Sequence, residues 1–174
     1  MVNNSPLRLK NVKWERELIH LDFAVWEPIY ERILEDFGFD RTGDEKAALF
    51  LSRMLTEENT ASLSELKAVI SGKPVLVCGN APKLRSDLSK INLSDFTVIA
   101  ADGAAAVLMD MGRVPEVTCT DLGGNSDADI EKEILACKNG SIILIHAHGD
   151  NIDKLGKTCP VLNVSLQLPR QDLL

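Results

Sequence analysis

Five short apolar runs rich in β-branched residues constrain the fold of this chain more than any other feature. They are PVLVC (74–78), FTVIAA (96–101), EVTCT (116–120), SIILIH (141–146) and PVLNVSL (160–166). Runs that are apolar almost throughout are typical of strands in a parallel sheet that is covered on both faces. Helix-like segments such as GAAAVLMDMG and SDADIEKEILACKNG lie between the first four runs. The alternation predicts an α/β protein with a mostly parallel sheet and helices on both faces.

The first seventy residues follow a different pattern, the three- and four-residue apolar spacing of amphipathic helices. In VWEPIYERILEDFGFD, Pro28 fits a first helical turn and Gly38 fits a left-handed stop. Two capping boxes are predicted, formed by Thr42 with Glu45 and by Ser62 with Glu65. We therefore expect a small helical N-terminal region over residues 1–72 and a Rossmann-like α/β domain over residues 73–174.

Charge and cysteine usage exclude several classes of function. The formal net charge is −7, from 26 acidic and 19 basic residues, so the global field repels a nucleic acid backbone. The four cysteines form no CxxC pair that would indicate zinc or redox chemistry. The start MVNNSPLRLK lacks an apolar signal core, and no run approaches the roughly 20 residues that span a bilayer. We expect a cytoplasmic protein without nucleic acid or membrane partners.

Glycine and polar side chains follow each of the first four runs, at the points where the strands are expected to end. They are Gly79 and Asn80, then Asp102 and Gly103, then Asp121, Gly123, Gly124 and Asn125, and finally His146, His148, Gly149, Asp150 and Asn151. Ligands of open parallel sheets bind beyond the carboxyl ends of the strands. The strand starts instead offer Lys73, Pro115 and Gly140, which is ordinary turn chemistry. The sequence therefore predicts one site at the carboxyl edge of the sheet.

These groups favour a phosphate ligand and a hard cation. Helix starts after CGNAP, with Pro82 in the first turn, and after ADGAA offer free N–H groups to an anion. Asp102, Asp121 and Asp150 are the kind of oxygen ligand that Mg²⁺ prefers. Zinc binding by His146 and His148 would lack a third nitrogen or sulfur ligand, so His148 is better interpreted as a phosphate hydrogen-bond donor. Neither a dinucleotide-binding glycine motif nor a P-loop occurs, which excludes both of those nucleotide sites.

Three segments resemble the archaeal 6-hydroxymethyl-7,8-dihydropterin diphosphokinase family, which is distantly similar to thiamine pyrophosphokinase. They are VLVCGNAPKL, AADGAAAVLMDMGRVPEVTCTDLGGN and ILIHAHGDNIDKL, within roughly residues 65–157. The resemblance implies a transferase that moves a diphosphate from ATP to the hydroxymethyl group of a reduced pterin and releases AMP. It also implies Mg²⁺ as cofactor and a place on the route to a folate-type or methanopterin-type cofactor.

The resemblance also implies roles for individual residues. It assigns Asp102, Asp121 and His148 to the catalytic centre, and Asp102, Asp121 and Asp150 to the metal. The residues that it assigns to the nucleotide and phosphate pocket are Gly79, Asn80, Gly103, Thr120, Gly124 and Asn151. No general base is assigned.

Two departures from the family pattern leave alternatives open. The family reads Thr-Asp-Leu-Asp-Gly after the third strand, whereas this chain has Gly123 at the second acidic position, so one expected metal carboxylate is missing. The last run continues as NVSLQLPRQDLL in place of a motif resembling Gly-Phe-Thr-Asp-Gly-Asp-Arg, which indicates a truncated or divergent C-terminus. The alternatives are a catalytically impaired nucleotide-binding protein of the same fold and a diphosphokinase of another alcohol such as thiamine. An incomplete sheet edge further predicts a homodimer.

Overall fold

The computed structural model describes residues 23–39, 41–55, 60–123, 126–161 and 165–167, and it divides into two compact units, residues 1–39 and 40–174. The element described in the first unit is helix α1 (Phe23–Phe37). Gly38 follows it with a φ of 67°, so the predicted left-handed stop is confirmed. Pro28 lies inside the helix rather than in the first turn of its described part, which corrects the prediction for that residue.

The second unit contains the sheet and the remaining helices. Its elements are α2 (Arg41–Met54), α3 (Leu63–Ile70), β1 (Val75–Cys78), α4 (Leu84–Leu88), η2 (Leu93–Asp95), β2 (Thr97–Ala101), α5 (Ala104–Asp110), β3 (Val117–Thr120), α6 (Asp127–Lys138), β4 (Ile142–Ile145), α7 (Ile152–Thr158), η3 (Cys159–Val161) and β5 (Ser165–Gln167). Helices α2 and α3, which the sequence assigned to the N-terminal region, therefore belong to the same compact unit as the sheet. Across the described part of the chain, the helices are too short or too polar to cross a membrane.

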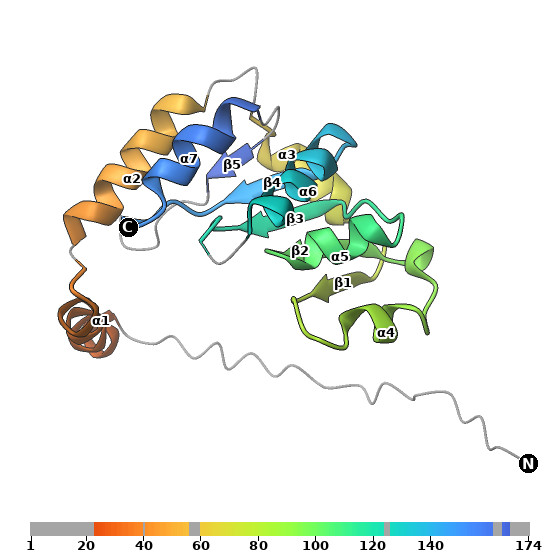
Figure 1. Cartoon of the computed structure of the whole chain (residues 1–174), viewed down its shortest axis with the longest axis horizontal. Coiled ribbons are helices and arrows are strands. Elements are labelled where there is room, and N and C mark those ends of the chain that lie inside the picture. The colour runs from red at the N-terminus through yellow and green to blue at the C-terminus, as the bar shows by residue number, and fades with distance from the viewer. Residues whose placement is uncertain (1–22, 40, 56–59, 124–125, 162–164, 168–174) are drawn as a thin grey trace, which may run out of the picture. The chain divides into compact units, whose positions relative to one another are not determined.

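The sheet has five parallel strands in the order β1-β2-β3-β4-β5 (Figure 1). Each strand pairs with the strand that follows it in the sequence. Right-handed crossovers therefore place the connecting helices, α4 to α7, on the same face of the sheet. The parallel α/β class is confirmed. The last apolar run is different from the prediction, because Cys159–Val161 form a short 3₁₀ helix and the strand is Ser165–Gln167.

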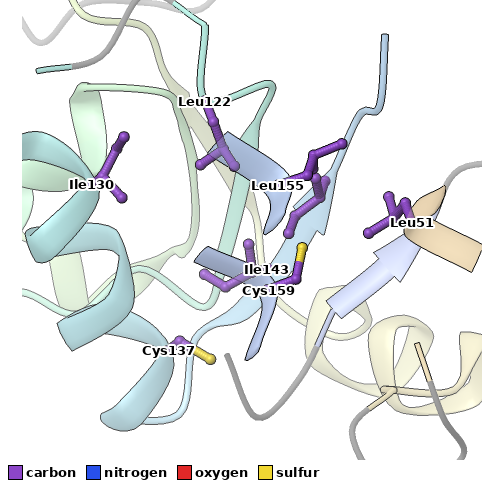
Figure 2. Close-up of a cluster of buried hydrophobic side chains, with 8 residues drawn as sticks. Leu51, Leu122, Ile130, Cys137, Ile143, Leu155 and Cys159 are labelled. Carbon is purple, nitrogen blue, oxygen red and sulfur yellow. The ribbon is translucent and has the colours of Figure 1, made fainter. Parts of the chain in front are cut away.

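Successive strand residues point to opposite faces of the sheet, and each face has its own helical cover. On one face, β2 packs against α4 and α5 through Val98, Ala100, Leu88 and Leu108. Further along this face, α2, α6 and α7 enclose a second cluster (Figure 2), formed by Leu51, Leu122, Ile130, Cys137, Ile143, Ile145, Leu155 and Cys159. On the opposite face, α3 covers the sheet through Leu66, Val69, Ile99, Val117, Ile142 and Leu144. Helices on both faces are thus confirmed.

Local capping explains where helix α3 begins, and the starts of α2 and α4 differ from the predictions. Ser62 and Glu65 form the predicted capping box of α3, with the Glu65 N–H donating to Ser62 Oγ at 3.2 Å and the Ser62 N–H donating to Glu65 Oε2 at 2.7 Å. Thr42 is instead the second residue of α2, so the other predicted box is wrong. Helix α4 begins at Leu84, and Pro82 lies in the turn before it rather than in its first turn.

An ion pair just before β3 is hydrogen-bonded to the amino-terminal part of β2. Arg113 Nη2 lies 2.6 Å from Glu116 Oε1, and Glu116 Oε2 accepts the Val98 N–H at 2.7 Å. Burial acts to raise the pKa of Glu116, but the hydrogen bonds from Arg113 and Val98 outweigh it and hold that pKa below its ordinary value of 4.5. This edge of the sheet is therefore stabilised by charge and, as the sequence indicated, carries structural residues.

We expect Glu116→Gln to lower the free energy of unfolding by about 1 kcal/mol at neutral pH, because charge-assisted hydrogen bonds are stronger than neutral ones. A carboxyl group with a lowered folded pKa contributes its full stability above pH 4.5 and loses it as the pH falls through the folded value. Urea unfolding from pH 7 to pH 3 should show the difference from wild type shrinking at the acidic end. Glu131→Gln, at an exposed position of α6, is the control, and an equal loss in both variants would contradict the assignment.

Candidate functional site

The carboxyl ends of β2 and β3 hold the backbone in unusual conformations. Among the described residues other than glycine, those with positive φ are Asp102 (φ 47°), after β2, and Leu122 (φ 61°), after β3. Such conformations cost of order 1–3 kcal/mol each and persist only where surrounding contacts enforce them. Aspartate tolerates this region fairly well, whereas leucine rarely adopts it. The strain therefore lies at the edge where the sequence predicts the site.

Asp102 and Asp121 lie next to each other at this edge. The Asp102 N–H donates to the Cys119 carbonyl at 2.8 Å, and Asp102 Oδ1 accepts the Asp121 N–H at 3.3 Å. Asp121 Oδ1 in turn accepts the Gly123 N–H at 2.7 Å. The two predicted acidic residues thus lie at neighbouring strand ends, and a hydrogen bond joins the Asp121 backbone to the Asp102 carboxylate.

His148 brings the loop after β4 to the same place. Its Nδ1 pairs with Asp150 Oδ1, and its Nε2 lies 3.4 Å from Asp121 Oδ2. That Nε2 atom is buried and has no hydrogen-bond partner among the described residues. Buried polar atoms in folded proteins are nearly always paired, so an unsatisfied one at a strand-end cluster indicates a place for a ligand atom.

Asn151 connects the loops that follow β3 and β4. Its side chain amide donates to the Asp121 carbonyl at 2.6 Å and to the His146 carbonyl at 2.9 Å. Its Oδ1 accepts the His148 N–H at 3.0 Å, and the residue is 1% exposed. Because these bonds use the amide and the carbonyl within the chain, the geometry favours a positioning role over the predicted nucleotide contact.

Helix α2 supports the loop that carries His148. The Gly149 N–H donates to Asp44 Oδ1 at 2.9 Å, and a Cβ atom on Gly149 would lie only 3.1 Å from the Gly43 carbonyl carbon. Glycine thus allows this loop to approach the start of α2 closely. Sequence reasoning missed Asp44, because 105 residues separate it from Gly149 and no local pattern joins them.

Lys154 is a second residue that sequence reasoning missed. From α7, its Nζ donates to the Leu122 carbonyl at 2.6 Å and to the Gly123 carbonyl at 2.8 Å. A signal was present, because Lys154 follows Asn151 by three residues, and residues three apart on a helix share a face. Using that signal would have required predicting the helix at 152–158.

The other predicted pocket residues have varied surroundings. Gly79 and Asn80 are exposed after β1, and Gly103 is the buried residue before α5. Thr120 is buried, and its Oγ1 accepts the Leu122 N–H at 3.0 Å, which supports the turn. Gly124 lies outside the described residues.

The three predicted metal carboxylates do not form one cluster. Within residues 23–39, 41–55, 60–123, 126–161 and 165–167, no three His, Cys, Asp or Glu side chains are grouped so that they could hold a metal ion. The physical reason is that the Asp150 carboxylate is turned to His148 Nδ1. Asp102 and Asp121 remain as carboxylate ligands for a cation. Water and substrate oxygens would have to complete the coordination of Mg²⁺.

The nearby cysteine does not act as a thiolate here. Burial, and in second place the charge of Asp102, raise the pKa of the Cys119 thiol above its ordinary value of 9.0. Burial likewise raises the pKa of Cys159 to about 11. Both groups are therefore neutral thiols at physiological pH and behave as small apolar side chains.

Comparison with known proteins places this geometry in a family. The family described as "6-hydroxymethylpterin diphosphokinase MptE-like" matches residues 51–168. The chain belongs to this family. The match takes in the whole strand-end cluster except Gly43 and Asp44, which precede it.

Two curated relatives show how far the MptE-like similarity extends. The 6-hydroxymethyl-7,8-dihydropterin pyrophosphokinase of Methanocaldococcus jannaschii is 37% identical over 158 residues, which cover 86% of this chain and 64% of the relative. The protein of the same name from Pyrococcus furiosus is 37% identical over 145 residues, covering 83% of this chain and 56% of the relative. The chain thus spans about three fifths of the length of these relatives.

Two glycine substitutions should have opposite effects on stability. Gly149→Ala should destabilise the fold by about 1–3 kcal/mol, because its Cβ would press on the backbone of α2. Gly156→Ala should stabilise it by up to about 1 kcal/mol, because its Cβ would make ordinary contact at 3.5 Å with Phe50 and alanine favours the helix. Urea unfolding measures the free energy of unfolding of both variants relative to wild type. Equal effects would show that the loop does not depend on close contact with α2.

Proposed function

We propose that this chain transfers a diphosphate group from ATP to 6-hydroxymethyl-7,8-dihydropterin, giving AMP and the pterin diphosphate. One observation carries the proposal. Asp102, Asp121 and His148 meet at three adjacent strand ends in a chain of the MptE-like family, whose curated relatives are named as pyrophosphokinases of this pterin. The same edge of the sheet also concentrates backbone strain and a buried histidine nitrogen, His148 Nε2, that lies 3.4 Å from Asp121 Oδ2 without a hydrogen bond among the described residues.

In the proposed reaction the hydroxymethyl oxygen of the pterin attacks the β-phosphorus of ATP. A new bond forms between that oxygen and the β-phosphorus, and the bond from the β-phosphorus to the oxygen bridging it to the α-phosphorus breaks. AMP leaves with the bridging oxygen, and the hydroxyl proton passes to solvent or to a phosphate oxygen. No covalent enzyme intermediate is needed, so the contribution of the protein is in-line placement and electrostatic stabilisation.

We propose that Asp102 and Asp121 hold Mg²⁺ together with the phosphate oxygens of ATP. The donor set fits, because Mg²⁺ is usually bound by one or two carboxylates plus substrate phosphates and water, and the Asp102 carboxylate lies within hydrogen-bond distance of the Asp121 backbone N–H. Such an ion would supply positive charge against the negative charge of the transferring group. Asp121 is held for this role by the N–H of Gly123.

We propose that His148 donates a hydrogen bond from Nε2 to a phosphate oxygen. Its Nδ1 is oriented by Asp150, and an imidazolium can donate from both nitrogens at once. A phosphate oxygen would give Nε2 the hydrogen-bond partner that it lacks among the described residues. Asp150 then acts through His148 instead of binding the metal.

Gly123 favours a second candidate, an impaired nucleotide-binding protein of the same fold. The second acidic residue of the family motif is absent at this position. A Cβ at residue 123 would lie 3.0 Å from Asp121 Oδ1, so an aspartate there would displace the present hydrogen bond between the two residues.

A diphosphokinase acting on thiamine is the remaining alternative. Comparing turnover of the pterin alcohol with turnover of thiamine would distinguish it from the pterin diphosphokinase.

We further propose a cytoplasmic homodimer that serves a folate-type or methanopterin-type route, without nucleic acid or membrane partners. The net charge of −7 opposes nucleic acid binding. At the β1 edge of the sheet, Val75 is 42% and Val77 is 69% exposed, which favours covering by a second copy. Light scattering should give twice the monomer mass, and a monomer at micromolar concentration would reject the dimer.

Incubation with ATP, Mg²⁺ and the pterin alcohol should yield AMP and the pterin diphosphate, measured by chromatography. Asp121→Asn should lower the rate at least about 100-fold, because it removes charge from the proposed metal and phosphate cluster. Asp153→Asn, on the exposed side of α7, is the matched control and should keep full activity.

Absence of AMP with wild type, together with nucleotide binding by calorimetry, would favour the impaired binding protein. Restoration of turnover in Gly123→Asp would assign the impairment to the missing carboxylate. A Gly123→Asp variant as inert as wild type would count against the diphosphokinase. AMP formed by wild type would reject the impaired protein directly.

A further inference from the structure

We propose that Lys154 is a positioning residue of this site, which holds the turn Asp121–Gly123 in the conformation that presents Asp121 to the phosphates. The identity of the ligand in this inference depends on the proposed function. The role of the Lys154 side chain is inferred from its contacts. Among the described residues, Lys154 and Asn151 bring donors from the start of one helix to the same turn.

Three successive backbone carbonyls of this turn accept hydrogen bonds from those two side chains. Asn151 donates to the Asp121 carbonyl, and Lys154 donates to the carbonyls of Leu122 and Gly123 at 2.6 and 2.8 Å. Bonds from an ammonium group to carbonyl oxygens are charge-assisted and stronger than neutral ones. Side chains at the start of α7 thus hydrogen-bond the three carbonyl groups of the turn.

Each N–H group of the same turn also donates to a side-chain oxygen. The Asp121 N–H donates to Asp102 Oδ1, the Leu122 N–H to Thr120 Oγ1 and the Gly123 N–H to Asp121 Oδ1. The side chain of Leu122 is fully buried in the cluster that also contains Leu155 of α7 (Figure 2). A turn with a leucine at φ 61° needs this many restraints, because the strained conformation would otherwise relax.

Lys154 also brings a positive charge to an edge that carries Asp102, Asp121 and Asp150. An ammonium group bound to the turn offsets part of the repulsion between these carboxylates and a polyphosphate. It does so without occupying the carboxylate oxygens, because both of its described acceptors are backbone carbonyls. The side chain therefore supports Asp121 in geometry and in charge without itself contacting the Asp121 carboxylate.

The experiment compares Lys154→Met, which removes the charge and the donors, with Lys154→Arg, which keeps both. Lys157→Met, three residues further along α7 and exposed, is the matched control. Hydrogen exchange of the Leu122 and Gly123 amides reports on the turn without any ligand. Calorimetry with α,β-methylene-ATP and Mg²⁺, and the KM and kcat for ATP, report on the site.

We expect Lys154→Met to speed exchange of the two amides at least about tenfold and to weaken binding of the ATP analogue about 10–100-fold, the usual range for residues that support ligand-binding groups. KM for ATP should rise in proportion to the loss of affinity. Lys154→Arg should restore most of the amide protection and most of the nucleotide affinity. Lys157→Met should match wild type in each measurement.

Unchanged exchange in Lys154→Met would overturn the inference. Faster exchange with unchanged analogue affinity would also overturn it, because Lys154 would then serve stability alone. If wild type binds no nucleotide while exchange still responds to Lys154→Met, the proposed function fails and the role of Lys154 in holding the turn stands.

Discussion

The buried amide of Asn151 is the interaction on which the arrangement of the strand ends depends. Parallel strands finish with carbonyl groups that have no further strand partner, and burying such groups unpaired costs about 1–3 kcal/mol each. The Asn151 side chain donates to one carbonyl after β3 and to one after β4, and it accepts a backbone N–H of the loop after β4. A single side chain therefore sets the spacing of the Asp121 turn and the His148 loop. An aspartate could not do the same, since it has no donors when ionised.

The strand order decides how the site is enclosed. In doubly wound sheets the order of strands reverses, and the helices diverge there to open a crevice for the ligand. Here the described strands run β1 to β5 without reversal (Figure 1). The place of the site along the edge is consequently set by the side chains after β2, β3 and β4. Helix α2 then supports the last loop through Asp44.

Backbone strain at Leu122 and the glycine at position 123 both concern the turn that carries Asp121. The leucine at positive φ is held by its buried side chain and by donors from α7, so the energy of the strained turn is offset by contacts on two sides. Gly123 lets its own N–H reach Asp121 Oδ1. With glycine at position 123, the backbone of the turn thus orients the single carboxylate of Asp121.

The sequence by itself determined the α/β class, the parallel strands and the edge where Asp102, Asp121 and His148 meet, because apolar runs and chain polarity are local properties. It also indicated the Ser62 capping box, which spans only four residues. Tertiary structure alone decided that Asn151 is buried against the Asp121 carbonyl and that Asp44 reaches the His148 loop. These facts depend on which loops lie side by side after folding, and no spacing within one segment encodes contacts across 105 residues.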